Sequence, residues 1–200
     1  MSDPKEYQTS LLKKLCLTTA VLMSVSAAAH AEQVLDYKIA LADDGKTYQV
    51  MMMPEKAPFA DVNLTGQVTI KVPHLDGGNA FRVKNLTSAM EGVTWVETSR
   101  VDAPEESPFY DYLSFSFLAT DSQAIRRFGW EAGQEQLMFS FENELGCLED
   151  ISLMENDDPF NTEDNSSNTN PGNHFTNLGW GNVSENNYRQ TYGDKIVCPQ

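Results

Sequence analysis

Apolar and polar residues alternate with a period of two along several short stretches of this chain. In residues 65–72, for example, Val68, Ile70 and Val72 are separated by polar residues, which is typical of a half-buried strand. Val, Ile and aromatic residues dominate the alternating positions, as expected in strands. The pattern predicts strands over residues 35–41, 47–51, 65–72, 80–86, 93–101, 112–118, 136–141 and 148–154.

Turn-forming residues separate these stretches. Asp44-Gly45 suits the positive φ angles of a tight turn and predicts a hairpin between the first two strands. Pro73 ends the third strand, and only residues 122–126 favour a short helical turn. Short antiparallel strands joined by turns predict an all-β fold, an antiparallel β-sandwich.

The last quarter of the chain has a different composition. Residues 156–187 hold ten asparagines, and Asn and Asp bond their own backbone and tolerate left-handed conformations. We therefore predict that residues 155–200 form a long Asn-rich loop region and a tail, packed on the sandwich by anchors such as Phe160 and Phe175.

The N-terminus has the pattern of a secretory signal peptide. Lys13 and Lys14 precede the apolar residues 15–25, and Ala29-His30-Ala31 ends the segment. We predict cleavage before Glu32, which leaves residues 32–200 as one domain, secreted or held at the cell surface. The apolar run is too short to span a bilayer, so no membrane insertion is expected after cleavage.

Export also bears on the cysteines and the charge. Cys16 leaves with the signal peptide, and an oxidising compartment would pair Cys147 with Cys198, stabilising the fold by about 4 kcal/mol on the chain-entropy model. The whole chain has a formal charge of −15, and removal of three lysines and two acidic residues with the signal peptide makes it −16. Such a charge opposes binding to nucleic acid or anionic lipid.

The Asn-rich region offers oxygen ligands of the kind that calcium prefers. The candidate ligands lie within one short stretch, and their spacing does not match an EF-hand loop. An ordinary hydrogen-bonded loop is the alternative. The predicted calcium ligands are Asp157, Asp158, Asn161, Glu163 and Asp164. No other cofactor is indicated.

Aromatic residues in turn or loop contexts favour carbohydrate binding, because sugar rings stack on exposed aromatic faces. The candidates for a sugar platform are Trp130, Trp180 and Tyr188, with Tyr110 and Tyr192 in similar contexts. The alternative is that the tryptophans belong to the core or hold the loop down.

Catalytic motifs are weak. The predicted mature chain keeps His74 and His174, and no Gly-x-Ser-x-Gly turn accompanies them. Both histidines fit surface or capping roles, so we predict no catalytic residues and no enzymatic activity. Paired carboxylates keep a secreted hydrolase open as an alternative.

Four segments resemble the strand rhythm of cohesin domains and the related cellulose-binding modules: residues 81–86, 112–117, 137–143 and 147–153. The resemblance covers about residues 60–155 and excludes the Asn-rich end. It implies a jelly-roll sandwich that binds a protein partner or a polysaccharide. It implies no catalysis and transfers no binding residue.

These observations together favour an exported structural or adhesion protein of the cell surface or extracellular matrix. It would act by binding a surface protein or polysaccharide, or by self-assembly through an edge strand such as residues 33–41. A carbohydrate-binding module is the first alternative, and a secreted hydrolase is the second.

Overall fold

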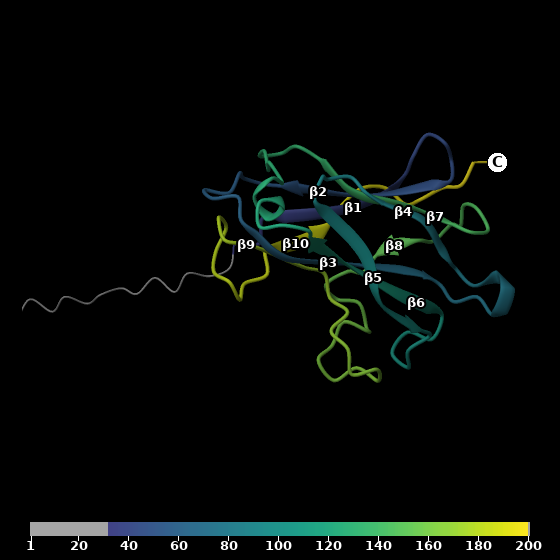
Figure 1. Cartoon of the computed structure of the whole chain (residues 1–200). Coiled ribbons are helices and arrows are strands. Elements are labelled where there is room, and N and C mark those ends of the chain that lie inside the picture. Colours follow the sequence, from purple (N-terminus) through teal and green to yellow (C-terminus); the bar gives the residue numbers. More distant parts are fainter. Residues whose placement is uncertain (1–31, 200) are drawn as a thin grey trace, which may run out of the picture.

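The structure is a computed structural model that describes residues 32–199, and strands make up nearly all of its regular secondary structure (Figure 1). Two sheets pack face to face, so the prediction of an all-β sandwich is confirmed. The predicted signal peptide, residues 1–31, lies outside the described residues. The strands are β1 (Leu35–Leu41), β2 (Thr47–Pro54), β3 (Asn63–Pro73), β4 (Val83–Ser88), β5 (Val93–Asp102), β6 (Tyr110–Ala119), β7 (Gln136–Asn143), β8 (Ser152–Leu153), β9 (His174–Asn177) and β10 (Tyr188–Thr191).

One sheet has the strand order β10-β1-β2-β7-β4, and the other has the order β5-β6-β3-β8, with β9 also paired to β3. The pairings are antiparallel except that between β1 and β10, which is parallel. Two 3-10 turns, η1 (Gly77–Asn79) and η2 (Ala124–Arg126), interrupt the strands, and η2 coincides with the predicted helical turn. No helix among residues 32–199 is both long enough and apolar enough to span a bilayer.

The hairpin of β1 and β2 follows directly from its turn chemistry. Gly45 has a φ of 70°, which costs glycine little because it lacks a Cβ. The carboxylate of Asp44 accepts hydrogen bonds from the backbone N–H groups of Lys46 and Thr47, at 3.0 and 2.9 Å. A hydrogen bond from the Thr47 hydroxyl, together with these two backbone bonds, lowers the pKa of Asp44 to about 2.

Aromatic rings from both sheets fill the interior. Phe115 of β6 lies 5.2 Å from Phe139 and 5.7 Å from Phe141, both on β7 of the opposite sheet, measured between ring centroids. Trp95 of β5 stacks on Phe139 at 4.9 Å. Because alternate residues of a strand face the same side, the two-residue period of the sequence delivers these rings to one core.

The Asn-rich region is more regular than the sequence predicts. It contains β9 and β10, so the chain runs from an edge of one sheet to an edge of the other. Buried asparagines support this course: Asn187 Oδ1 accepts the backbone N–H of Asn177 at 2.7 Å, and Asn173 Oδ1 accepts that of Thr69 at 2.8 Å. The predicted Asn-rich loop region and tail, residues 155–200, therefore also contribute two short edge strands.

The proposed self-assembly strand, residues 33–41, is not a free edge along its whole length. β1 pairs with β2 from Leu35 to Leu41, and Leu35–Tyr37 also pair with β10 on the other side. β10 is therefore the outer strand at this side of the sheet. β8 is also shorter than predicted, because only Ser152 and Leu153 of residues 148–154 form a ladder with β3.

Candidate functional site

The three aromatic residues predicted as a sugar platform are buried. Trp130, Trp180 and Tyr188 are 4%, 2% and 2% exposed, so none presents a ring face to a ligand. The Nε1–H of Trp130 donates to Asn63 Oδ1, and that of Trp180 donates to the carbonyl of Lys56, both at 2.9 Å. The prediction that these residues bind sugar is therefore corrected: they belong to the core.

The predicted calcium ligands do not converge on one point. Asp158 is buried and accepts hydrogen bonds from Lys71 Nζ at 2.6 Å and from the Tyr112 hydroxyl at 2.8 Å. Asn161 donates its side-chain amide to the carbonyl of Asn156, while Asp157, Glu163 and Asp164 are exposed. Among residues 32–199, no three carboxylate, imidazole or thiol groups gather closely enough to hold a metal ion.

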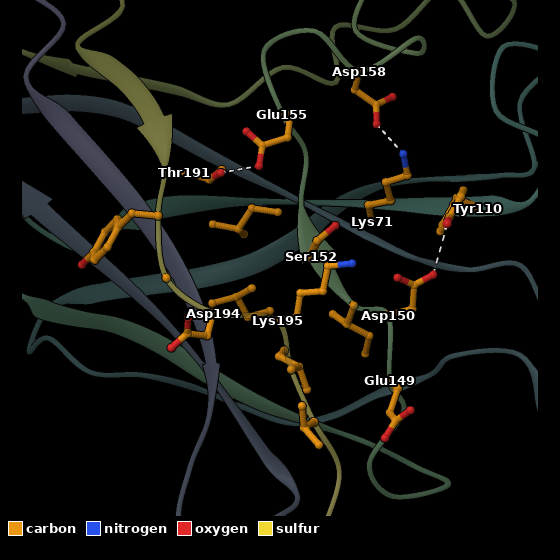
Figure 2. Close-up of a pocket in the computed structure, with 17 residues that line it drawn as sticks. Lys71, Tyr110, Glu149, Asp150, Ser152, Glu155, Asp158, Thr191, Asp194 and Lys195 are labelled. Atoms are coloured by element: carbon orange, nitrogen blue, oxygen red, sulfur yellow. Dashed lines mark hydrogen bonds and ion pairs between the residues drawn. The ribbon is translucent and has the colours of Figure 1, made fainter.

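A hollow of about 650 Å³ opens where the edges of the two sheets meet, and we call it the edge groove (Figure 2). Residues 149–153 with Glu155 and Asp158 form one wall, and residues 191–197 form the other. Ile39 of β1, Lys71 of β3 and Tyr110 of β6 complete the lining. The groove thus combines residues that lie far apart in the sequence.

The floor of the edge groove is apolar. Ile39, Ile151, Leu153 and Ile196 line it, and each is less than a tenth exposed. They also belong to the main hydrophobic core, so the groove opens directly onto the space between the sheets. An apolar floor beneath polar groups is typical of ligand sites, and the volume falls within their usual range.

A partly buried ion pair lies at one end of the groove. Lys71 Nζ lies 2.6 Å from Asp158 Oδ2, and it also lies 4.4 Å from the centroid of the Tyr110 ring. The Tyr110 hydroxyl donates to Asp150 Oδ2 at 3.1 Å, and this contact raises the pKa of Tyr110. The ammonium group of Lys71 therefore contacts a carboxylate oxygen as well as the face of a phenol ring.

The opposite wall is the chain that follows β10. The Thr191 hydroxyl donates to Glu155, and the side chain of Lys195 extends toward Ser152 (Figure 2). A disulfide joins Cys198, just past this wall, to Cys147, just before the other. The predicted cysteine pair therefore links the two walls of the groove.

Carboxylates outnumber ammonium groups in the groove. Lys71 and Lys195 are the cationic side chains of its lining, so five carboxylates leave a formal charge of −3. The five carboxylates belong to Glu149, Asp150, Glu155, Asp158 and Asp194. Sequence reasoning identified Tyr110, Tyr192 and Asp158 as candidates for other sites, but no local motif indicated that they share a groove.

The two histidines have different partners. Nδ1 of His74 lies 2.6 Å from Oδ1 of the buried Asp111, and this hydrogen bond raises the pKa of His74. Nε2 of His174 lies 3.0 Å from the hydroxyl oxygens of Thr65 and Thr176, and burial lowers the pKa of His174. Neither histidine lines the edge groove.

No family model, curated protein or solved structure matches the chain.

Proposed function

We propose that this protein is an exported β-sandwich that acts by binding, at the cell surface or in the extracellular matrix, and that the edge groove is its binding site. The observation that carries the proposal is the groove itself, which has an apolar floor and a polar rim where the sheets meet. The rim offers carboxylate, hydroxyl and ammonium groups that can orient a ligand over that floor.

The secretory pattern of residues 1–31 supports the extracellular setting. The disulfide between Cys147 and Cys198 supports it as well, because such bonds persist in oxidising compartments. Since the disulfide links both walls of the groove, it also favours a preformed site over one that assembles on binding.

Filling the groove tests the proposal. Ser152 is an exposed strand residue in the groove, so Ser152→Trp places a large ring there. Ser99 is an exposed strand residue on β5 and does not line the groove, so Ser99→Trp is the matched control. Purified proteins would be applied to an array of random peptides and to a glycan array, with thermal unfolding as the check of folding.

We expect the original protein and Ser99→Trp to bind a shared set of peptides, and Ser152→Trp to lose them. Binding that survives in Ser152→Trp would place the site elsewhere. An absence of binding on both arrays would overturn the proposal.

Carbohydrate binding is the second candidate, and the two tyrosines of the groove favour it. Tyr110 and Tyr192 are partly exposed and line the groove, unlike the buried Trp130 and Trp180. Glycan binding that disappears in Tyr192→Ala and in Ser152→Trp would support this alternative. Peptide binding without glycan binding would reject it.

A further inference from the structure

The charge of the edge groove favours a ligand of opposite charge. Its lining carries a formal charge of −3, within a chain of formal charge −15. Charges set in a hollow with apolar walls concentrate ions of the opposite sign. An anionic ligand would meet like charge along this rim, whereas a cationic one would be attracted to it.

The groove also has carboxylates free to receive a cation. Asp158 already pairs with Lys71, but Glu149 and Asp194 take part in none of the ion pairs formed within residues 32–199. Both side chains are exposed on the rim. Lys71 shows how a cationic side chain is bound in this groove, because its ammonium group contacts both a carboxylate and the face of a phenol ring.

One strand edge at the groove suits an extended ligand. β8 pairs with β3 and with no other strand of the described chain. The outer edge of β1 is covered instead: β10 pairs with it as far as Tyr37, and beyond that Gly193 packs against the side chain of Lys38 and Pro199 packs against Gly45. An extended peptide can add to the edge of β8 as a further strand.

The protein's own residues in the edge groove show which side chains fit there. In the wall formed by residues 191–197, Ile196 is 7% exposed and packs into the core, while its neighbour Lys195 extends across the groove toward Ser152 (Figure 2). One basic and one aliphatic side chain, on adjacent residues of this wall, therefore both line the groove.

We propose that the edge groove binds an extended basic peptide segment of a partner protein, in which lysine or arginine alternates with aliphatic residues. This inference rests on the proposed function, since it names the ligand of the same groove. The aliphatic side chains contact the floor at Ile151 and Leu153, and the cationic side chains reach Glu149 and Asp194 on the rim.

Three synthetic peptides of equal length test the sign of the charge: alternating valine and lysine, valine and glutamate, and valine and serine. We expect the valine–lysine peptide to bind and the valine–glutamate peptide not to bind in titration calorimetry. Added salt should weaken the binding, because it screens charges on an open rim.

Two double variants separate a local effect from one of net charge. Glu149→Gln with Asp194→Asn removes the free rim carboxylates, and we expect it to weaken binding of the valine–lysine peptide about three- to tenfold. Asp43→Asn with Glu91→Gln makes the same change of charge at exposed positions outside the groove and should leave binding unchanged. Equal losses in both variants would overturn the inference.

The outcomes also distinguish this inference from the proposed function. Equal binding of the valine–serine and valine–lysine peptides, with both lost in Ser152→Trp, would leave the groove as the binding site and overturn the cationic ligand. Failure of every peptide to bind in the groove would overturn the basic-peptide ligand, and a glycan array free of binding as well would overturn both.

Discussion

The indole Nε1–H of Trp130 donates a hydrogen bond of 2.9 Å to Oδ1 of Asn63 inside the core. The same oxygen accepts the side-chain amide of Asn177 at 2.7 Å, and Nδ2 of Asn63 donates to the carbonyl of Ile125 at 2.9 Å. Asn63 is fully buried, and it satisfies the buried side-chain N–H groups of Trp130 and Asn177 together with the partly buried carbonyl of Ile125.

Replacing Asn63 with leucine should therefore destabilise the fold. The side chain keeps a similar size, but two buried N–H groups and one partly buried carbonyl lose a partner, and we expect a loss of about 3 kcal/mol in the free energy of unfolding. Urea unfolding followed by tryptophan fluorescence measures it. Asn170→Leu, at an exposed asparagine, should change the stability by less than about 0.5 kcal/mol. Similar losses in both variants would contradict the assigned role.

The ion pair between Lys71 and Asp158 provides a second test. The side chains are 19% and 4% exposed, so Lys71→Met leaves a buried carboxylate without its cation. We expect a loss of about 3 kcal/mol. Lys56→Met breaks an ion pair with Glu32 in which both side chains are about half exposed, and it should cost less than about 1 kcal/mol. A double-mutant cycle with Asp158→Asn measures the coupling energy between the two side chains. A coupling energy near zero would mean that Lys71 acts independently of Asp158 and would contradict the assigned ion pair.

The strands were predictable where alternation is local. Leu113, Phe115 and Phe117 alternate with polar or small residues, and that period alone places them on the inner face of β6. The tight turn at Gly45 was predictable for the same reason, because its chemistry depends on adjacent residues. The pairing of Cys147 with Cys198 followed from their number and the exported setting.

The other features of the fold and the edge groove depend on contacts between distant parts of the chain, which no local sequence pattern predicts. β10 lies in an Asn-rich segment with little apolar alternation, and it forms because β1 offers a partner for Tyr188. Trp130 and Trp180 lie in loops, as predicted, but a loop that packs on the sheets buries its anchors. The edge groove requires two sheet edges and residues from the whole chain, so its lining could not be assembled from sequence.

Calcium should leave the stability unchanged. Lys71 already neutralises Asp158, and the other predicted ligands do not gather around it. We expect equal melting temperatures in calcium and in EDTA. Because Asp158 also holds the Tyr112 hydroxyl, the variant that probes the predicted site is Asp157→Asn with Glu163→Gln. A calcium-dependent rise in melting temperature that this variant abolishes would restore the predicted site.

His74 should make the stability depend on pH. The hydrogen bond and charge of Asp111 raise the pKa of His74, with smaller contributions from Asp76 and Asp102. A raised pKa means that the folded state holds the proton more tightly than the unfolded one. The resulting stabilisation is complete below the ordinary histidine pKa of about 6.5 and is lost as the pH rises through the folded value. His74→Gln should remove this part of the pH dependence, measured as melting temperature against pH. If His74→Gln kept the same difference in melting temperature between acidic and alkaline buffers as the wild-type protein, the assigned role of His74 would be contradicted.

The disulfide should stabilise both the fold and the groove. Cys147 and Cys198 are 51 residues apart, and the chain-entropy model assigns the cross-link about 4 kcal/mol. We expect Cys147→Ser with Cys198→Ser to lower the urea midpoint, and dithiothreitol to lower that of the original protein to the same value. Dithiothreitol should not affect the double variant, which serves as the control for side effects of the reductant.

Because the disulfide links the walls at residues 149–153 and 191–197, its loss should also weaken binding of the valine–lysine peptide under conditions where the fold remains intact. Unchanged binding by a folded double variant would show that the wall formed by residues 191–197 keeps its position without the cross-link.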